Sequence, residues 1–169
     1  GEDFNVHEEN GRLVYHDEIG LLDLPLPRLS GRHQHENAAT AIAALRIVMP
    51  ELPEWAIEQG PLEARWPARL QRLSQGVFSL IAPAGAEIWL DGGHNEDGGR
   101  VLAAAMADLE ERSAQPLTMI VGMLTTKDPR GFLGHFVGLA RTVITVPVTA
   151  QKASFAPEEL ADIAAELGM

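Results

Sequence analysis

The order of strand-like and helix-like segments after Gly76 constrains the fold of this chain more than any other feature. "LTMIVGML" (117–124) and "TVITVPV" (142–148) are continuous apolar runs, the pattern of strands that are buried on both faces of a sheet. Strands that alternate with helices predict an α/β fold with a mostly parallel, doubly wound, Rossmann-like sheet. The helices are expected before, between and after these runs, at 97–112, 129–140 and 156–168.

The first part of the chain has a different pattern. Residues 1–30 are expected to be extended, because Gly20, Pro25 and Pro27 interrupt their short apolar stretches. "ENAATAIAALRIVMP" (36–50) is rich in alanine and predicts a helix that stops at its final proline. This part is therefore expected to form a unit separate from the strand–helix alternation.

Shorter elements lie between these two parts. We expect a domain boundary near Trp66-Pro67, because the pattern changes there from helix to strand. The two domains would then cover residues 1–65 and 66–169. The elements around the boundary are expected to be a helix at 53–58, a turn at Gly60-Pro61, and two strands near 77–81 and 87–90.

Composition narrows the class of protein. Apolar residues make up 46% of the chain, which is enough for a hydrophobic core, and Trp55, Trp66 and Trp89 are expected to lie in it. The net charge of −11 disfavours nucleic acid and anionic membranes as partners. The sequence has no cysteine, no signal-peptide pattern and no apolar run long enough to span a membrane. We expect a cytoplasmic protein.

"DGGHN" (91–95) places three polar side chains at the end of a predicted strand. In doubly wound sheets, ligands bind beyond the carboxyl ends of the strands. Asp91 could accept hydrogen bonds from a ribose, and His94 and Asn95 can donate to and accept from a nucleotide or a carbonyl. The structural alternative is a glycine-rich turn in which Asp91 only caps the following helix.

Three other polar segments are candidates for function. Asn37, at the start of the alanine-rich helix, could contact a base or a phosphate, and the same stretch could simply form a helix N-terminus. "RWPARLQR" (65–72) supplies three arginines that could clamp a phosphate or remain solvated. Lys127 and Asp128 could form a surface turn or part of a site. The remaining histidines without an expected role are His7, His16 and His135.

Taken together, four motifs resemble the folylpolyglutamate synthase and dihydrofolate synthase family of the Mur ligase superfamily. The matching stretches are "GRHQHENAATAIAAL" (like G-x-H-Q-x-x-N-A), "WPARLQ" (like W-P-G-R-x-E), "LDGGHNEDGG" (like D-G-A-H-N-P) and "VGMLTTKD" (like G-x-x-x-D-K-D). They span residues 31–128. The chain departs from the family pattern at Gln71, Gly93, Glu96 and Thr126, and none of these departures removes an expected ligand.

The resemblance implies an ATP-dependent, magnesium-requiring amide ligase of folate biosynthesis and polyglutamylation. Such enzymes join L-glutamate to dihydropteroate or folates through an acyl phosphate, in a cleft between an ATPase domain and a smaller α/β domain. Residues 1–65 resemble the end of the ATPase domain, and 66–169 resemble most of the second domain. Because no GxxxxGK[ST] loop is present, we expect an inactive C-terminal fragment of a monomeric enzyme whose upstream domain mainly binds ATP and Mg²⁺.

The resemblance also implies a role for each matching residue. Asn37 would contact the adenine or its ribose, and Arg69 the ATP phosphates. Asp91 would contact the ribose, and His94 the nucleotide phosphates or the acyl phosphate, with Asn95 in support. No metal ligand is expected in this chain.

Three alternatives remain open at this point. One is a Mur-type peptidoglycan precursor ligase, in which a similar D-x-A-H-N element occurs. A second is a nucleotide-binding module without catalysis. The third is a metal-dependent hydrolase that would use His33, His35, Asp91 and His94 as ligands.

Overall fold

A computed structural model describes residues 3–169 of the chain. The chain divides into two compact units, of which one runs to Gly92 and the other covers Gly93–Met169. The domain boundary expected near Trp66-Pro67 stays a prediction. Within the described residues, no helix combines the length and the apolar character needed to cross a membrane.

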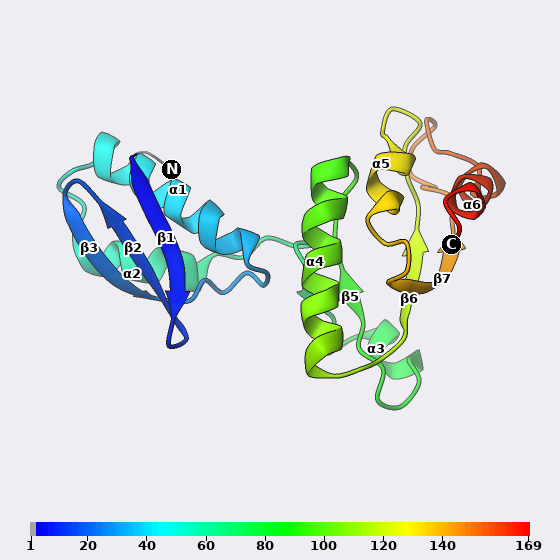
Figure 1. The fold of residues 1–169 in the computed structure, drawn as a ribbon, viewed down its shortest axis with the longest axis horizontal. Helices are drawn as coiled ribbons and strands as arrows, with labels where there is room; N and C mark the ends of the chain where they lie inside the picture. Colours follow the sequence, from blue (N-terminus) through cyan, green and yellow to red (C-terminus); the bar gives the residue numbers. More distant parts are fainter. Residues whose placement is uncertain (1–2) are drawn as a thin grey trace. The chain divides into compact units, whose positions relative to one another are not determined.

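The first unit begins with a three-stranded antiparallel sheet (Figure 1), with β1 at Phe4–Glu9, β2 at Arg12–Asp17 and β3 at Gly20–Pro25. Asn10 and Gly11 form the two-residue turn between β1 and β2, with φ of 51° and 74°. These left-handed values define the turn that an Asn-Gly pair favours in hairpins. The prediction of extended structure for residues 1–30 is confirmed for these strands, and residues 1–2 lie outside the described part.

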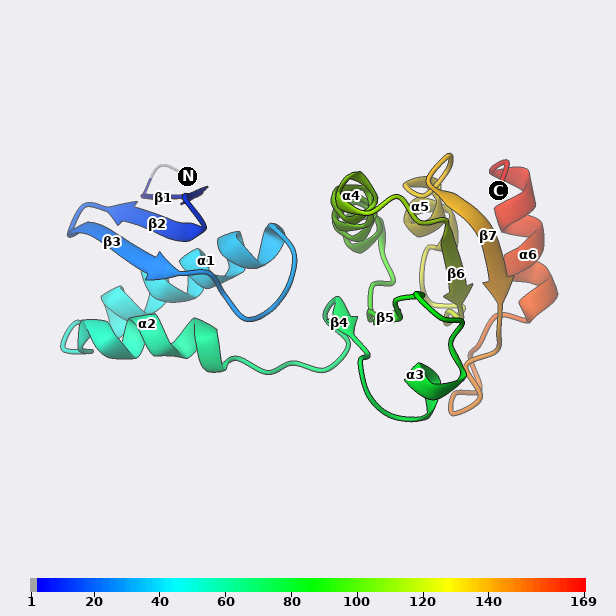
Figure 2. The ribbon, with the colours of Figure 1, turned by 90° about the horizontal axis from the view of Figure 1, so that it is seen from below.

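Two helices cover one face of this sheet, α1 at His33–Val48 and α2 at Glu54–Glu63 (Figure 2). Both predicted helices are confirmed, and both are longer than expected. The turn predicted at Gly60-Pro61 is wrong, because α2 continues through Pro61 and the Ala64 amide still donates to the Gly60 carbonyl. The core between the sheet and the helices consists of Leu13, Tyr15, Leu22, Leu24, Ala39, Ile42 and Ile57.

A half-buried ion pair joins β2 to α1. Arg46 Nε lies 3.3 Å from Asp17 Oδ2, and the two side chains are only 13% and 11% exposed. The Tyr15 hydroxyl donates to the same Asp17 oxygen at 3.0 Å, and the Arg46 guanidinium lies over the Tyr15 ring. Asp17 thus pairs with both Tyr15 and Arg46, whereas Arg46 Nη1 is buried without a hydrogen-bond partner among the described residues.

The remainder of the first unit is less regular. β4 (Gln71–Arg72) pairs antiparallel with β5 (Trp89–Leu90), so the strand predicted near 87–90 is confirmed in part. The strand predicted at 77–81 is wrong, because Val77–Ile81 forms the short helix α3. The Ser79 hydroxyl donates to the Gly76 carbonyl and supports its first turn. A short apolar run does not by itself distinguish a strand from a helix.

The second unit contains a parallel pair of strands, β6 (Leu117–Val121) and β7 (Ala140–Thr145), connected through α5 (Pro129–Gly134). The helices α4 (Glu96–Arg112) and α6 (Pro157–Glu166) complete it (Figure 2). This arrangement confirms an α/β fold with a parallel strand pair. The core consists of Ala103, Met119, Val121, Met123, Phe132, Leu133, Phe136, Leu160 and Ala164.

Two predictions about burial are wrong. The apolar runs at 117–124 and 142–148 were expected to be buried on both faces, but Ile120 is 70% exposed and Ile144, its partner in the register, is 46% exposed. Trp55 and Trp66 are each 66% exposed rather than in the core, while Trp89 is half-buried. Trp66 lies on the segment that connects α2 to β4, outside the helices and strands.

Candidate functional site

Arg69 lies on a short loop with an unusual backbone. Its two neighbours, Ala68 and Leu70, both adopt left-handed conformations, with φ of 57° and 42°. Residues other than glycine rarely adopt this conformation, and such strain concentrates at functional sites. Ala68 is a further departure from the family pattern, because W-P-G-R-x-E has glycine at this position, and glycine adopts this conformation readily.

Three hydrogen bonds hold this loop in place. The Leu70 amide donates to Asp91 Oδ2 at 2.6 Å, and the Gly92 amide donates to the Ala68 carbonyl at 2.9 Å. The Ala68 amide donates to Gln71 Oε1 at 3.0 Å. Leu70 itself is only 4% exposed. The structure therefore brings Asp91 to the Arg69 loop, where its carboxylate fixes the backbone beside the arginine.

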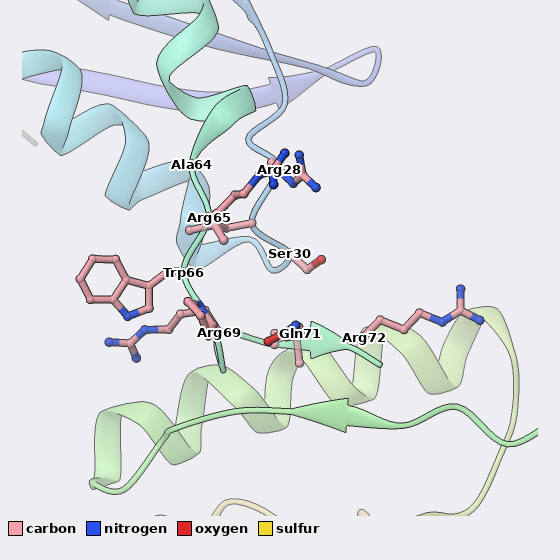
Figure 3. A pocket seen from close by; sticks show the side chains of 11 residues that line it. Arg28, Ser30, Ala64, Arg65, Trp66, Arg69, Gln71 and Arg72 are labelled. Atoms are coloured by element: carbon pink, nitrogen blue, oxygen red, sulfur yellow. The ribbon is translucent and has the colours of Figure 1, made fainter. Parts of the chain in front are cut away.

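A pocket of about 470 Å³ adjoins the loop, lined by residues 28–30, 64–67 and 69–72. Four of the lining residues are arginines, at positions 28, 65, 69 and 72, and none is acidic. Figure 3 shows that the side chains of Arg28 and Arg65 point toward one another, whereas Arg69 and Trp66 extend to the other side of the connecting segment. The pocket thus concentrates positive charge in a chain with a net charge of −11.

The four arginines differ in their partners. Arg72 Nη2 lies 2.5 Å from Glu87 Oε1. Arg28, Arg65 and Arg69 form no side-chain ion pair with any residue of the described range 3–169. Guanidinium groups bind carboxylates and phosphates through paired hydrogen bonds. The pocket is therefore suited to an anionic ligand.

Arg28 was not among the residues that the sequence singled out. It follows β3 in the segment "PLPRLSG", which resembles an ordinary loop. Its amide donates to the carbonyl of Pro61 at 3.0 Å, and this bond fixes the segment beside the end of α2. No local pattern could have predicted this long-range contact.

Asn37 lies in the first turn of α1 and is exposed. Its Nδ2 donates to Gln34 Oε1 at 3.1 Å, and the Gln34 amide nitrogen in turn contacts the ring of His33 at 2.8 Å. Asn37 is not among the residues that line the arginine pocket. The contact between Asn37 and a nucleotide therefore stays a prediction.

His94 and Asn95 belong to the second unit. Asn95 caps α4, because its Oδ1 accepts a hydrogen bond from the Gly98 amide at 2.8 Å. The capping role considered for Asp91 is therefore filled by Asn95. His94 directly precedes this cap and is exposed. Asp128 caps α5 in the same way through the Gly131 amide, at 3.0 Å, so it has a structural role beside the exposed Lys127.

The described residues contain no preformed site of the kind that the metal-dependent alternative would need. Within the described range there is no group of three or more histidine or acidic side chains arranged to hold a metal ion. His33 instead takes part in the hydrogen-bond chain with Gln34 at the start of α1. The set His33, His35, Asp91 and His94 is thus not gathered into one cluster.

No protein-family model matches the chain. Among curated proteins, the folylpolyglutamate synthase of Lacticaseibacillus casei is 33% identical over 149 residues, which amount to 85% of this chain and 32% of that enzyme. This match extends well beyond the four motifs, which lie between residues 31 and 128.

Solved structures agree with this match. The structure of E. coli FolC in complex with DHPP and ADP matches 98% of this chain and 36% of its own length, with a TM-score of 0.79 and 27% identity. A bifunctional folylpolyglutamate synthase/dihydrofolate synthase with Mn, AMPPNP and L-glutamate bound matches 95% of this chain and 35% of its own, with a TM-score of 0.73 and 25% identity. The chain therefore belongs to the folylpolyglutamate synthase and dihydrofolate synthase family, and it spans about a third of the length of the relatives that it matches.

Proposed function

We propose that this chain is part of an ATP-dependent ligase that adds L-glutamate to dihydropteroate, to folates, or to both. In the proposed reaction a carboxylate of the folate is activated as an acyl phosphate, and the glutamate amine displaces phosphate to form an amide. The names of the relatives support the substrate class, and the neighbouring structures were obtained with ADP, AMPPNP and L-glutamate. The observation that carries the proposal is the acid-free arginine pocket beside the Arg69 loop.

Arg69 is proposed to bind the phosphates of ATP. Phosphoryl transfer depends mainly on positioning and on neutralising negative charge. A guanidinium without an acidic partner, on a loop fixed by Asp91 and Gln71, can supply both. Bound ATP would provide the phosphoryl group, and the contribution of this chain would be to orient and stabilise the phosphates.

The other site residues are proposed to act around the same nucleotide. Asn37 would contact the adenine or ribose, Asp91 the ribose, and His94 the phosphates or the acyl phosphate. Asn95 would support His94 through its cap on α4. A neighbouring structure was obtained with Mn bound, and we propose that Mg²⁺ is held mainly by residues upstream of this chain and that the chain alone is inactive.

The test is ADP release by the full-length protein that contains this chain. We expect release that requires both L-glutamate and either dihydropteroate or a folate. Arg69→Ala should lower kcat/KM by roughly 10²-fold or more, because a charge-stabilising donor is removed. Arg100→Ala is the control, since Arg100 pairs with Asp97 on the surface of α4. Release that depends instead on a peptidoglycan precursor, or an unaffected Arg69→Ala variant, would contradict the proposal.

A further inference from the structure

We propose that Arg28 and Arg65 form a second anion site in the same pocket, which binds a carboxylate or phosphate group other than the one bound by Arg69. The inference rests on the proposed function, because it assigns a further part of the ligands to that pocket. It concerns two residues to which the family motifs give no role. Arg28 lies outside all four motifs, and Arg65 directly precedes the Trp66 at which one motif begins.

Two chain segments are fixed so that these side chains converge. Arg28 follows β3, and Arg65 follows the end of α2. The hydrogen bond from the Arg28 amide to the Pro61 carbonyl, at 3.0 Å, ties the first segment to the last turn of α2. The two guanidinium groups then point toward one another at the wall of the pocket (Figure 3). The convergence is thus set by backbone contacts and not by flexible side chains alone.

No carboxylate of the described residues neutralises this pair, although acidic residues outnumber basic ones by 24 to 13. Four other exposed arginines have an acidic partner, in the pairs Arg12–Asp23, Arg72–Glu87, Arg100–Asp97 and Arg130–Glu166. Arg112 and Arg141 form no ion pair in the described residues either, but neither of them lines this pocket. Arg28 and Arg65 line the same pocket and point toward one another in Figure 3, without an acidic partner in the described residues. Bringing two like charges together is unfavourable unless an anion lies between them.

The chemistry of the pair defines the ligand group. Each guanidinium offers a planar set of donors that matches a carboxylate or a phosphate. Because Arg69 and Trp66 extend to the other side of the connecting segment (Figure 3), one small anion bound by Arg69 would not also occupy the Arg28–Arg65 pair. The ligand must therefore carry at least two separate anionic groups, or two anions must bind. In the proposed reaction the sources are the carboxylates of a glutamyl chain on the folate and the phosphates of ATP or of the product.

The experiment compares Arg28→Gln, Arg65→Gln and the double variant in the full-length enzyme, with Arg141→Gln as the control. Arg141 is an exposed arginine on β7, outside the pocket. Three quantities are measured: the KM for folates that carry one or several glutamyl residues, the KM for ATP, and inhibition by inorganic phosphate. We expect the double variant to raise one of these constants by about tenfold, the effect of losing charged hydrogen bonds, with kcat changed by less than about twofold.

The pattern of the change identifies the source. A KM effect that grows with the number of glutamyl residues would assign the site to carboxylates. An equal effect on ATP or on phosphate inhibition, whatever the chain length, would assign it to phosphate. Arg65→Lys should restore part of either effect, because the charge remains. Constants that all match the control in an active enzyme would overturn the inference alone, whereas a wild-type enzyme without folate- and glutamate-dependent ADP release would overturn the proposed function and this site with it.

Discussion

At the scale of single residues, the backbone beside Arg69 matters as much as its side chain. Ala68 and Leu70 adopt left-handed φ values on either side of it, at a cost of about 1 kcal/mol for each residue that carries a Cβ. The loop keeps this shape because Asp91, Gln71 and Gly92 hydrogen-bond to it. The backbone that positions Arg69 therefore has a conformation that Ala68 and Leu70 would not favour without these hydrogen bonds.

Ala68→Gly should relieve part of this strain. Glycine adopts a φ of 57° without the clash of a Cβ, and this gain exceeds the entropy that glycine adds to the unfolded chain. We expect the free energy of unfolding to rise by roughly 0.5–1 kcal/mol, measured by urea denaturation. Ala104→Gly, at an exposed position inside α4, is the matched control and should lower it by about 1 kcal/mol. If the free energy of unfolding fell equally in both variants, the backbone at Ala68 would not be strained.

Asp91 should act at least in part through the Arg69 loop. Asp91→Ala leaves the Leu70 amide without its acceptor, which costs about 1–3 kcal/mol, whereas Asp91→Asn keeps an oxygen there. We expect Asp91→Ala to lower kcat/KM for ADP release by roughly tenfold or more, with most of the loss recovered in Asp91→Asn. The effects of Asp91→Ala and Arg69→Ala should not add in the double variant.

A second substrate separates this role from the proposed ribose contact. If Asp91 mainly contacts a ribose hydroxyl, its alanine variant should lose discrimination between ATP and a deoxyribose analogue. Additive effects with Arg69→Ala, together with lost discrimination, would contradict a positioning role and support the ribose contact alone.

At the scale of elements, the link between β2 and α1 makes stability depend on pH. Burial alone would raise the pKa of Asp17, but hydrogen bonds from Tyr15, Gly20 and Ile19, with Arg46 nearby, hold it below its usual value. A carboxylate with a lowered pKa stabilises the fold above its unfolded pKa, and this stability is lost as the pH falls through the folded pKa. Burial and then Asp17 raise the pKa of Tyr15 to about 12, so its own contribution is lost only above pH of about 10.

Asp17→Asn should therefore lower the free energy of unfolding most at neutral pH. We expect a loss of about 2 kcal/mol near pH 7, because Arg46 is left half-buried without its counter-charge. The difference from wild type should shrink as the pH falls below about 4. Asp23→Asn is the control, since the Asp23–Arg12 pair is exposed and contributes less than about 1 kcal/mol. Denaturation curves at several pH values measure the stability of both variants. A difference between Asp17→Asn and wild type that did not change with pH would show that Asp17 is not the source of the pH dependence.

The packing of α4 on α5 depends on a residue without a side chain. A Cβ on Gly99 would lie 2.5 Å from the carbonyl oxygen of Phe132 and 2.9 Å from its Cα. Because both contacts are backbone, Gly99→Ala should destabilise the second unit by about 2 kcal/mol. Gly134→Ala, where no atom lies within 4 Å of the added Cβ, should be neutral or slightly stabilising. Thermal unfolding distinguishes the two variants. An unchanged unfolding temperature in Gly99→Ala would show that α4 and α5 can move apart to admit the Cβ.

The sequence predicted the helices and strands correctly where the apolar or periodic segment was long. The helices α1, α4 and α6 and the parallel strands β6 and β7 all overlap the segments predicted as such, although α1, α4 and β7 begin one to three residues earlier than predicted. The helix predicted at 129–140 is α5, which already ends at Gly134. The prediction failed at Val77–Ile81, where a run of five residues with four apolar side chains is too short to show a period. It also failed on the burial of Ile120, because a continuous apolar run does not reveal whether a neighbour covers each face.

At the scale of the whole molecule, the sequence motifs predicted most residues of the candidate site, but they did not predict which of these residues contact one another. Arg69 and Asp91 stand in separate motifs, and only the fold shows that Asp91 accepts a hydrogen bond from the residue next to Arg69. Arg28 belongs to no motif, and its place in the pocket depends on a long-range bond to Pro61. Sequence spacing indicates which residues carry chemistry, whereas hydrogen bonds between distant segments decide which of them act together.

The acid-free wall of the pocket has a consequence for how ligands arrive. At a distance, an anion meets the repulsion of a chain that carries eleven more negative than positive charges, and it meets attraction only on reaching the arginines. Dissolved ions weaken forces that act beyond about 8–10 Å much more than forces at contact. A modest amount of added salt should therefore speed the capture of an anionic ligand by this chain, the reverse of the behaviour of a uniformly basic surface.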